Sequence, residues 1–164
     1  MAEPAELIAA IRERGEAYAS FVEGLTAEEF HYRPAPDDWT AAELTGHVAE
    51  FPVTFAERSE QIAATPGLTV GRAETDPGRL AAVARLAGAG PVEAARAVRA
   101  GVERAAEILS RLPPAAWQAT ATHRTQGTRT VEQMVEAFIA NHLRAHLAQA
   151  RRTIEAARQA QPGS

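Results

Sequence analysis

The sequence of 164 residues contains no cysteine, and all 17 of its basic positions are arginine, so lysine is absent as well. Without cysteine the chain can form neither a disulfide nor a thiolate metal site, and it has no thiol nucleophile of its own. Without lysine it lacks a Schiff-base lysine, a phosphate-loop lysine and a lysine general base. If thiol chemistry takes place on this protein, the thiol therefore arrives with a small molecule.

Long apolar runs and basic tracts are also missing. No stretch approaches the ~20 apolar residues that cross a bilayer, and the first residues, Met-Ala-Glu-Pro-Ala-Glu, lack the basic and apolar regions of a signal peptide. The formal net charge is −4, and no run of arginines is interleaved with aromatic residues. The sequence therefore predicts a cytoplasmic protein that binds neither a membrane nor a nucleic acid.

Alanine is abundant and β-branched residues are sparse, which favours helices over strands. Apolar residues recur at helical spacing in four long segments, and a minor helix is expected between the second and third of them. The long helices are expected over 4–24, 40–65, 91–112 and from 130 to just before Pro162, and the minor helix over 79–86. The segments 66–78 and 115–129 are expected to be polar loops.

This pattern predicts an all-α protein with a four-helix bundle in a single domain over residues 1–160, followed by a flexible tail over 161–164. Pro52 lies within the second long helix and is expected to bend it. Because the connections after the first and third long helices are long, the sequence leaves the order of the helices in the bundle open.

Three histidines are predicted to face the bundle interior from two helices. His142 and His146 lie one turn apart at the edge of an apolar stripe, and His47 lies within the apolar stripe of the second long helix. Three imidazole nitrogens can hold a divalent metal and leave one coordination position open, and imidazole suits zinc, nickel and cobalt alike. The alternative is a set of core histidines that hydrogen-bond to neighbouring helices.

Other polar residues are weaker candidates for a site. Glu50 follows His47 by three residues and could hydrogen-bond to an imidazole or a metal-bound water, although a solvated position is favoured. His31 and His123 lie in or beside polar loops and are expected to be exposed. The sequence has no His-Glu-x-x-His motif, and its one Glu-x-x-His pattern, Glu28 to His31, lies beside a loop, so neither a thermolysin-like site nor a di-iron site is expected.

Two stretches resemble the DinB-like (YfiT-like) superfamily. Residues 33–48, RPAPDDWTAAELTGHV, resemble its Pro/Trp-Ser/Thr-x-x-Glu-Leu-x-x-His segment, and residues 142–149, HLRAHLAQ, resemble its C-terminal His-x3-His. The resemblance implies a four-helix bundle that holds a divalent metal, often zinc or nickel, on three histidines, here His47, His142 and His146. Members with known activity include thiol-dependent S-transferases and the mycothiol-dependent maleylpyruvate isomerase, and several are homodimers.

Two classes of function follow from these observations. The first is a metal-dependent S-transferase in which the ion activates a low-molecular-weight thiol toward a small-molecule electrophile, with a hydrolase that uses metal-bound water as a variant. The second is a non-catalytic, stress-linked or ligand-binding dimeric bundle. The open coordination position separates the two, because a solvent-reaching cleft beside it favours chemistry and a fourth protein ligand favours a structural metal. A homodimer is expected in either case.

Overall fold

The structure, a computed structural model, describes residues 3–161. Its long helices are α1 (Pro4–Glu23), α3 (Ala41–Ala64), α5 (Pro91–Ser110) and α7 (Asn141–Ala160), and its shorter ones are α2 (Ala27–His31), α4 (Pro77–Ala87) and α6 (Val131–Val135). A 3-10 turn, η1 (Pro114–Gln118), precedes α6, and a π-helical segment, η2 (Glu136–Ala140), joins α6 to α7. The predicted four-helix bundle is confirmed, and all but the first residue of the predicted tail lies outside the described residues.

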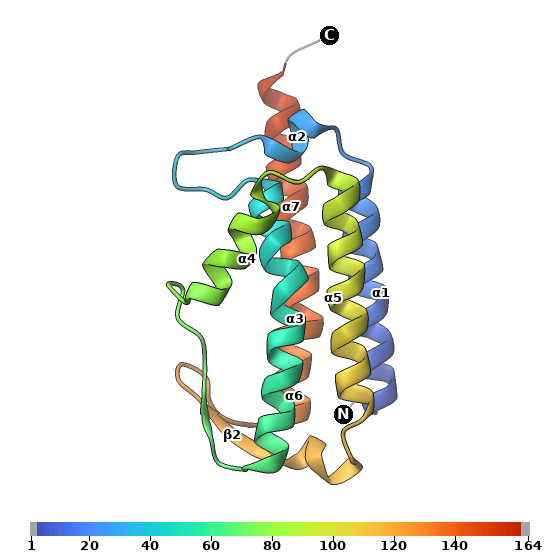
Figure 1. Cartoon of the computed structure of the whole chain (residues 1–164), viewed down its shortest axis with the longest axis vertical. Coiled ribbons are helices and arrows are strands. Elements are labelled where there is room, and N and C mark those ends of the chain that lie inside the picture. Colours follow the sequence, from blue (N-terminus) through green and yellow to red (C-terminus); the bar gives the residue numbers. More distant parts are fainter. Residues whose placement is uncertain (1–2, 162–164) are drawn as a thin grey trace.

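The four long helices pack so that neighbours in sequence are not always neighbours in space (Figure 1). Both α1 and α3 pack against α5 and α7, so the order around the bundle is α1, α5, α3, α7. The chain runs in one direction along α1 and α7 and in the opposite direction along α3 and α5. The parallel neighbours α3 and α5 require a long crossover connection, and the segment that contains α4 provides it.

The helix starts follow the capping signals in the sequence. Thr40 Oγ1 accepts a hydrogen bond from the Glu43 backbone N–H at 3.1 Å, and the Glu43 carboxylate accepts one from the Thr40 N–H at 2.8 Å. Thr130 and Gln133 repeat this exchange at 3.2 and 3.1 Å. These bonds satisfy N–H groups that have no partner within the helix, and they fix where α3 and α6 begin.

Glycines allow α3 to lie very close to two neighbouring helices. A Cβ atom on Gly101 of α5 would lie 2.0 Å from the Ala49 carbonyl oxygen, and one on Gly46 would lie 2.5 Å from the Ala82 carbonyl oxygen of α4. Both contacts are with backbone atoms, which cannot move aside as the end of a side chain can. The helices α4 and α5 are therefore seated directly on α3.

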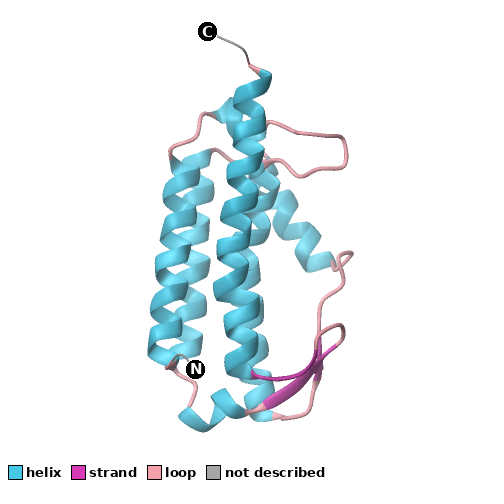
Figure 2. Ribbon diagram, turned by 180° about the vertical axis from the view of Figure 1, so that it is seen from behind, coloured by secondary structure: helices cyan, strands magenta, loops and turns pink. Residues whose placement is uncertain are grey.

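The two segments predicted as polar loops contain a small sheet, which corrects that prediction (Figure 2). Strand β1 (Thr69–Val70) pairs in parallel with β2 (Thr120–His123), and β2 pairs antiparallel with β3 (Gly127–Thr130). Gly127 turns the hairpin with a φ of 74°, a conformation that glycine adopts at little cost. The strands are two to four residues long and mostly exposed, so they lack the apolar alternation by which strands are recognised in sequence.

The sequence predicted the fourth long helix as one continuous α-helix, but a π-helical segment interrupts it. Its π-helical segment η2 ends directly before Asn141, the residue that precedes His142. A π turn contains one residue more than an α turn, so it rotates the following residues by about 100° relative to a continuous α-helix. With this rotation Leu143 becomes fully buried, at 0% exposure, and the histidine pair turns toward α3.

The helix α4 also begins earlier than predicted. Asp76 accepts a hydrogen bond from the Arg79 backbone N–H at 3.0 Å, and Pro77 occupies the first helical position. Within residues 3–161, no helix combines the length and the apolar character that crossing a membrane requires.

Candidate metal centre

The structure brings together the three histidines predicted to face inward. His47 comes from α3, and His142 and His146 come from successive turns of α7. One ring nitrogen from each lies within 4.8 Å of the others, and His47 Nε2 lies 3.0 Å from His142 Nε2. The ring centroids are 5.0 Å apart for His47 and His142, 5.1 Å for His47 and His146, and 4.1 Å for His142 and His146. The rings therefore meet at one point between two antiparallel helices.

Burial keeps all three imidazoles neutral. Burial, together with the smaller effect of neighbouring positive charges, lowers the pKa of His47 to about 3 and that of His142 to about 2. Burial also lowers the pKa of His146, against the hydrogen bond that His146 donates to Gln149, which raises it. A neutral imidazole carries a lone pair on one nitrogen and can bind a metal without first losing a proton.

A glutamine fixes the orientation of His146. The Gln149 Oε1 atom lies 2.8 Å from His146 Nδ1, and an amide oxygen only accepts, so Nδ1 carries the proton and donates it. The lone pair of His146 is then on Nε2. Histidine ligands of metals are commonly held in this way, by a hydrogen bond from the ring nitrogen that does not bind the ion.

The cluster fits a divalent metal by its donor chemistry and its spacing. Two nitrogens that are each about 2.0–2.1 Å from one zinc ion lie about 3 Å apart, which is the separation of His47 Nε2 and His142 Nε2. A hydrogen bond between the two rings would give the same distance, but it would not account for the third imidazole, which also has a ring nitrogen within 4.8 Å of the other two. Three converging imidazole nitrogens match the ligand set of a metal site with an open position.

Aromatic rings surround the histidines on the side of α3. The Phe51 ring stacks on His142 with centroids 4.2 Å apart, and the Trp39 ring lies 5.7 Å from that of His47. The guanidinium of Arg79, from the first turn of α4, lies 5.1 Å from the Trp39 ring centroid. Trp39 thus belongs to the wall of the site.

A cavity of about 730 Å³ opens beside the cluster and includes His142 in its wall. Its apolar wall consists of aromatic rings, and its rim consists of charged residues from α3 and from the segment that leads into α4. The aromatic wall contains Phe51, Phe55, His123 and Phe138, and the rim contains Glu50, Arg58, Arg72, Glu74 and Asp76. The volume is in the range of small-molecule sites, which is about 300–1,000 Å³.

His123 differs from the exposed loop histidine that was predicted. It lies at the end of β2, is partly buried, and stacks on Phe138 with centroids 4.7 Å apart. Burial lowers its pKa. The β-hairpin carries it to the cavity wall, and that hairpin had no clear signal in the sequence. His31, in contrast, is exposed as predicted.

Glu50 lines the cavity but is bonded elsewhere. Its carboxylate accepts hydrogen bonds from Arg72 at 2.7 and 2.8 Å and from the Thr54 hydroxyl. Among the described residues it makes no hydrogen bond to the three histidines. Its suggested contact with a bound water stays a prediction.

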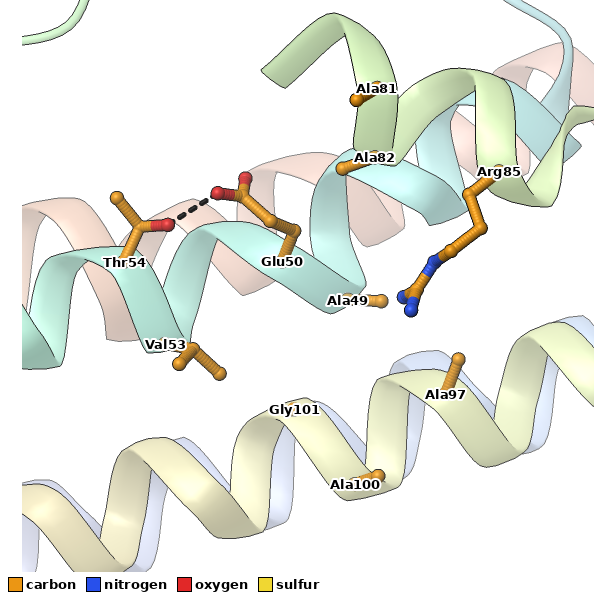
Figure 3. A pocket seen from close by; sticks show the side chains of 10 residues that line it. All are labelled: Ala49, Glu50, Val53, Thr54, Ala81, Ala82, Arg85, Ala97, Ala100 and Gly101. Carbon is orange, nitrogen blue, oxygen red and sulfur yellow. Dashed lines mark hydrogen bonds between the residues drawn. The ribbon is translucent and has the colours of Figure 1, made fainter. Parts of the chain in front are cut away.

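A second hollow, drawn in Figure 3, lies between α3, α4 and α5 and has a volume of about 600 Å³. Half of the labelled residues in it are alanines, and the polar ones are Glu50, Thr54 and Arg85. None of the histidines lines it, so the candidate chemistry belongs to the cavity beside His142.

Comparisons with known proteins agree with this architecture. The structure is similar to that of YfiT from Bacillus subtilis, described as a probable metal-dependent hydrolase with an unusual four-helix bundle topology. The TM-score is 0.68 at 14% sequence identity, over 93% of this chain and 88% of that chain, which establishes a shared fold. No curated protein matches the sequence. The sequence matches the family model of the DinB superfamily over residues 10–150, a span that includes all three histidines, and the chain therefore belongs to the DinB superfamily.

Proposed function

We propose that this protein is a metal-dependent enzyme that transfers a low-molecular-weight thiol to a small-molecule electrophile, with zinc or nickel on His47, His142 and His146. The observation that carries the proposal is the convergence of three neutral imidazoles, one of which, His142, lies in the wall of a 730 Å³ cavity. A closed structural metal site would instead have a fourth protein ligand, and no cysteine, aspartate or glutamate among residues 3–161 joins the three histidines.

The chain's own residues would prepare the site for the ion and the reactants. The hydrogen bond from His146 to Gln149 presents Nε2, and burial keeps all three rings unprotonated at neutral pH. A divalent ion held there would act as a Lewis acid that lowers the pKa of a thiol or water placed in its open position. The aromatic wall formed by Phe51, Phe55 and Phe138 would exclude water and hold the apolar part of the electrophile.

The surrounding carboxylates favour a thiol over water as the nucleophile. Hydrolysis benefits from a carboxylate that is able to take a proton from the attacking water. On the cavity rim, Glu50 and Asp76 are each paired with Arg72, at 2.7 and 2.8 Å, and the third carboxylate, that of Glu74, is exposed to solvent. A thiol, with an ordinary pKa near about 8.5, needs only the ion to become a thiolate. The likeness to YfiT, a probable metal-dependent hydrolase, keeps hydrolysis as the second candidate.

The test combines metal analysis with a panel of thiols. Purified protein is expected to contain about one divalent ion per chain, and adding a thiol is expected to accelerate consumption of a generic electrophile such as chlorodinitrobenzene. His142→Ala is expected to lose both the ion and the thiol-dependent rate, whereas His31→Ala, which changes an exposed histidine, serves as the matched control. Helical circular dichroism is expected to remain, because the buried apolar stripes do not include these rings.

Three outcomes decide between the candidates. If His142→Ala loses the metal but keeps an undiminished thiol-dependent rate, the metal-thiolate mechanism is ruled out. A metal-dependent rate with ester or amide substrates that thiols do not accelerate favours the hydrolase. Bound metal without turnover of either substrate class favours a ligand-binding bundle.

A further inference from the structure

Arg79 contacts the aromatic wall of the histidine cluster and has no acidic partner among residues 3–161. It is partly buried, and its Nε atom is buried without a hydrogen-bond partner. Its guanidinium carbon lies 5.1 Å from the Trp39 ring centroid, and the Trp39 ring lies 5.7 Å from that of His47. The Trp39 ring therefore connects Arg79 to the cluster, and the charge of Arg79 also lowers the pKa of all three histidines.

Two other arginines show that this arrangement is unusual within the same region. Arg72 lies on the cavity rim and forms ion pairs with Glu50 and Asp76, which balance its charge. Arg85, two turns further along α4, has no acidic partner either, but it is exposed and points into the separate hollow of Figure 3. Water can solvate Arg85, whereas the buried Nε of Arg79 is shielded from it.

Arg79 is also held in place despite its missing partner. Its side chain lies over the Trp39 ring, and its backbone N–H is fixed by Asp76 in the first turn of α4. A cation in the first turn of a helix is opposed by the helix dipole, so the position does not serve the stability of α4. The chain thus keeps a positioned guanidinium with unused donors beside a site that is suited to a doubly charged cation.

We propose that Arg79 recognises a carboxylate on the small molecule that binds at the histidine cluster, so that the preferred thiol is one that carries a carboxylate. This assignment rests on the proposed function. A guanidinium presents paired N–H donors that match the two oxygens of a carboxylate. An anion there also offsets the repulsion between Arg79 and the metal. A carboxylate carries one negative charge and balances one guanidinium, whereas a phosphate dianion would need a second basic partner.

The test compares two thiols of similar size on cobalt-loaded protein, whose absorption spectrum reports thiolate coordination. Mercaptoacetate is expected to bind at least tenfold more tightly than 2-mercaptoethanol to the wild-type protein. Arg79→Gln is expected to remove this preference by weakening mercaptoacetate binding while leaving 2-mercaptoethanol binding unchanged. Arg79→Lys is expected to keep part of the preference for mercaptoacetate. Arg85→Gln removes one charge from the same helix, as Arg79→Gln does, and is expected to keep the full preference.

A second measurement does not depend on the metal. In a Trp117→Phe background, Trp39 is the remaining tryptophan, and acetate is expected to alter its fluorescence in metal-free protein at concentrations where chloride at equal ionic strength does not. Arg79→Gln is expected to abolish this response while circular dichroism shows an intact fold.

The outcomes separate the two proposals. If cobalt and both thiols bind but no carboxylate preference exists, the assignment of Arg79 is overturned and the proposed function stands. If cobalt does not bind, the proposed function is overturned, and the acetate response then decides whether Arg79 forms an anion site. Absence of both the preference and the acetate response overturns the assignment entirely.

Discussion

Gln149 is the residue on which the orientation of His146 depends, and its replacement tests that role directly. Gln149→Ala removes the oxygen that accepts the Nδ1 proton at 2.8 Å. Loss of such a supporting hydrogen bond typically weakens metal affinity about 10–100-fold. We expect a decrease of that size in a competition titration against a chromophoric chelator. Gln161→Ala, at the end of α7, is the matched control, and equal affinities for all three proteins would show that Gln149 plays no part.

The buried histidines also predict how the metal-free protein responds to acid. Their pKa values are lowered to about 3 for His47 and about 2 for His142, from an ordinary value near 6.5. Below about pH 6.5 these histidines therefore bind protons in the unfolded chain but not in the folded chain. The free energy of unfolding is thus greatest above that pH and decreases below it. Between pH 7.5 and 5.5 each such histidine lowers the free energy of unfolding by about 1.4 kcal/mol.

Urea unfolding in the presence of a chelator measures this effect. Above pH 5.5 most carboxylates are still ionised in both states, so the histidines dominate the slope. His142→Gln is expected to reduce the loss of stability between pH 7.5 and 5.5 by about 1.4 kcal/mol, whereas His31→Gln is expected to leave it unchanged. A pH-independent unfolding free energy in the wild-type protein would contradict the burial of neutral histidines.

At the level of residues, the sequence identified the histidines but not their surroundings. His47, His142 and His146 could be grouped because His47 lies within one apolar stripe and the other two lie one turn apart at the edge of another, although the π-helical segment contributes to turning that pair toward α3. Gln149 could also have been found, since it follows His146 by three residues and shares its face. Arg79 and His123 could not, because α4 and the β-hairpin bring them to the site, and no periodicity in the sequence encodes how those elements dock.

At the level of elements, the close contact between α3 and α4 makes Gly46 a sensitive position. A Cβ atom there would lie 2.5 Å from the Ala82 carbonyl oxygen and 2.9 Å from Val83 Cα, both backbone atoms. Overpacking costs about 1–3 kcal/mol, and the gain in helix propensity on replacing glycine offsets up to about 1 kcal/mol of it. We expect Gly46→Ala to lower the free energy of unfolding by about 2 kcal/mol.

Gly88→Ala is the control for this substitution. It lies at the C-terminal end of α4 with a negative φ of −103°, and a Cβ atom there meets nothing within 4 Å. Its effect on unfolding in urea is expected to remain within about 0.5 kcal/mol. Equal effects of the two alanines would mean that α4 is not seated on α3 in solution.

The same elements show where sequence patterns are sufficient for prediction. Thr40 with Glu43 and Thr130 with Gln133 mark helix starts through local hydrogen bonds, and both starts were predicted. The π-helical segment before Asn141 was not, because α-helix and π-helix bury almost the same apolar residues over five positions. The strands β2 and β3 depend on pairing with each other and with β1, a long-range interaction that a short polar segment does not reveal.

At the level of the whole molecule, the bundle order accounts for the position of the site. Because α3 and α7 are antiparallel neighbours, and α6 and η2 extend the last helix before α7 begins, an N-terminal turn of α3 can face the first turns of α7 (Figure 1). The crossover that allows α3 and α5 to run in parallel contains α4, and the first turn of α4 supplies Arg79. The connection that the topology requires therefore also covers the histidine cluster.

The remaining expectation for the whole molecule is association into a homodimer. Among the described residues, the large apolar side chains that stay about half exposed are Leu80 at 51% and Val92 at 52%, which belong to α4 and α5. These helices also border the hollow of Figure 3, whose alanines Ala81, Ala97 and Ala100 would let a partner helix approach closely. Contact between such faces removes apolar surface from water at about 25 cal/mol per Å². We therefore expect light scattering to give the mass of two chains.

Charge substitution on this face tests the expectation. The double variant Leu80→Asp and Val92→Asp places a charge on each of the two helices, and burying an unpaired charge is costly, so we expect its dimer dissociation constant to rise at least tenfold. Ala145→Asp, on the exposed side of α7, is the matched control and should stay dimeric. A wild-type protein that remains monomeric across a wide range of concentrations would contradict the dimer. A dimer that the double variant leaves intact would place the interface on another helix face.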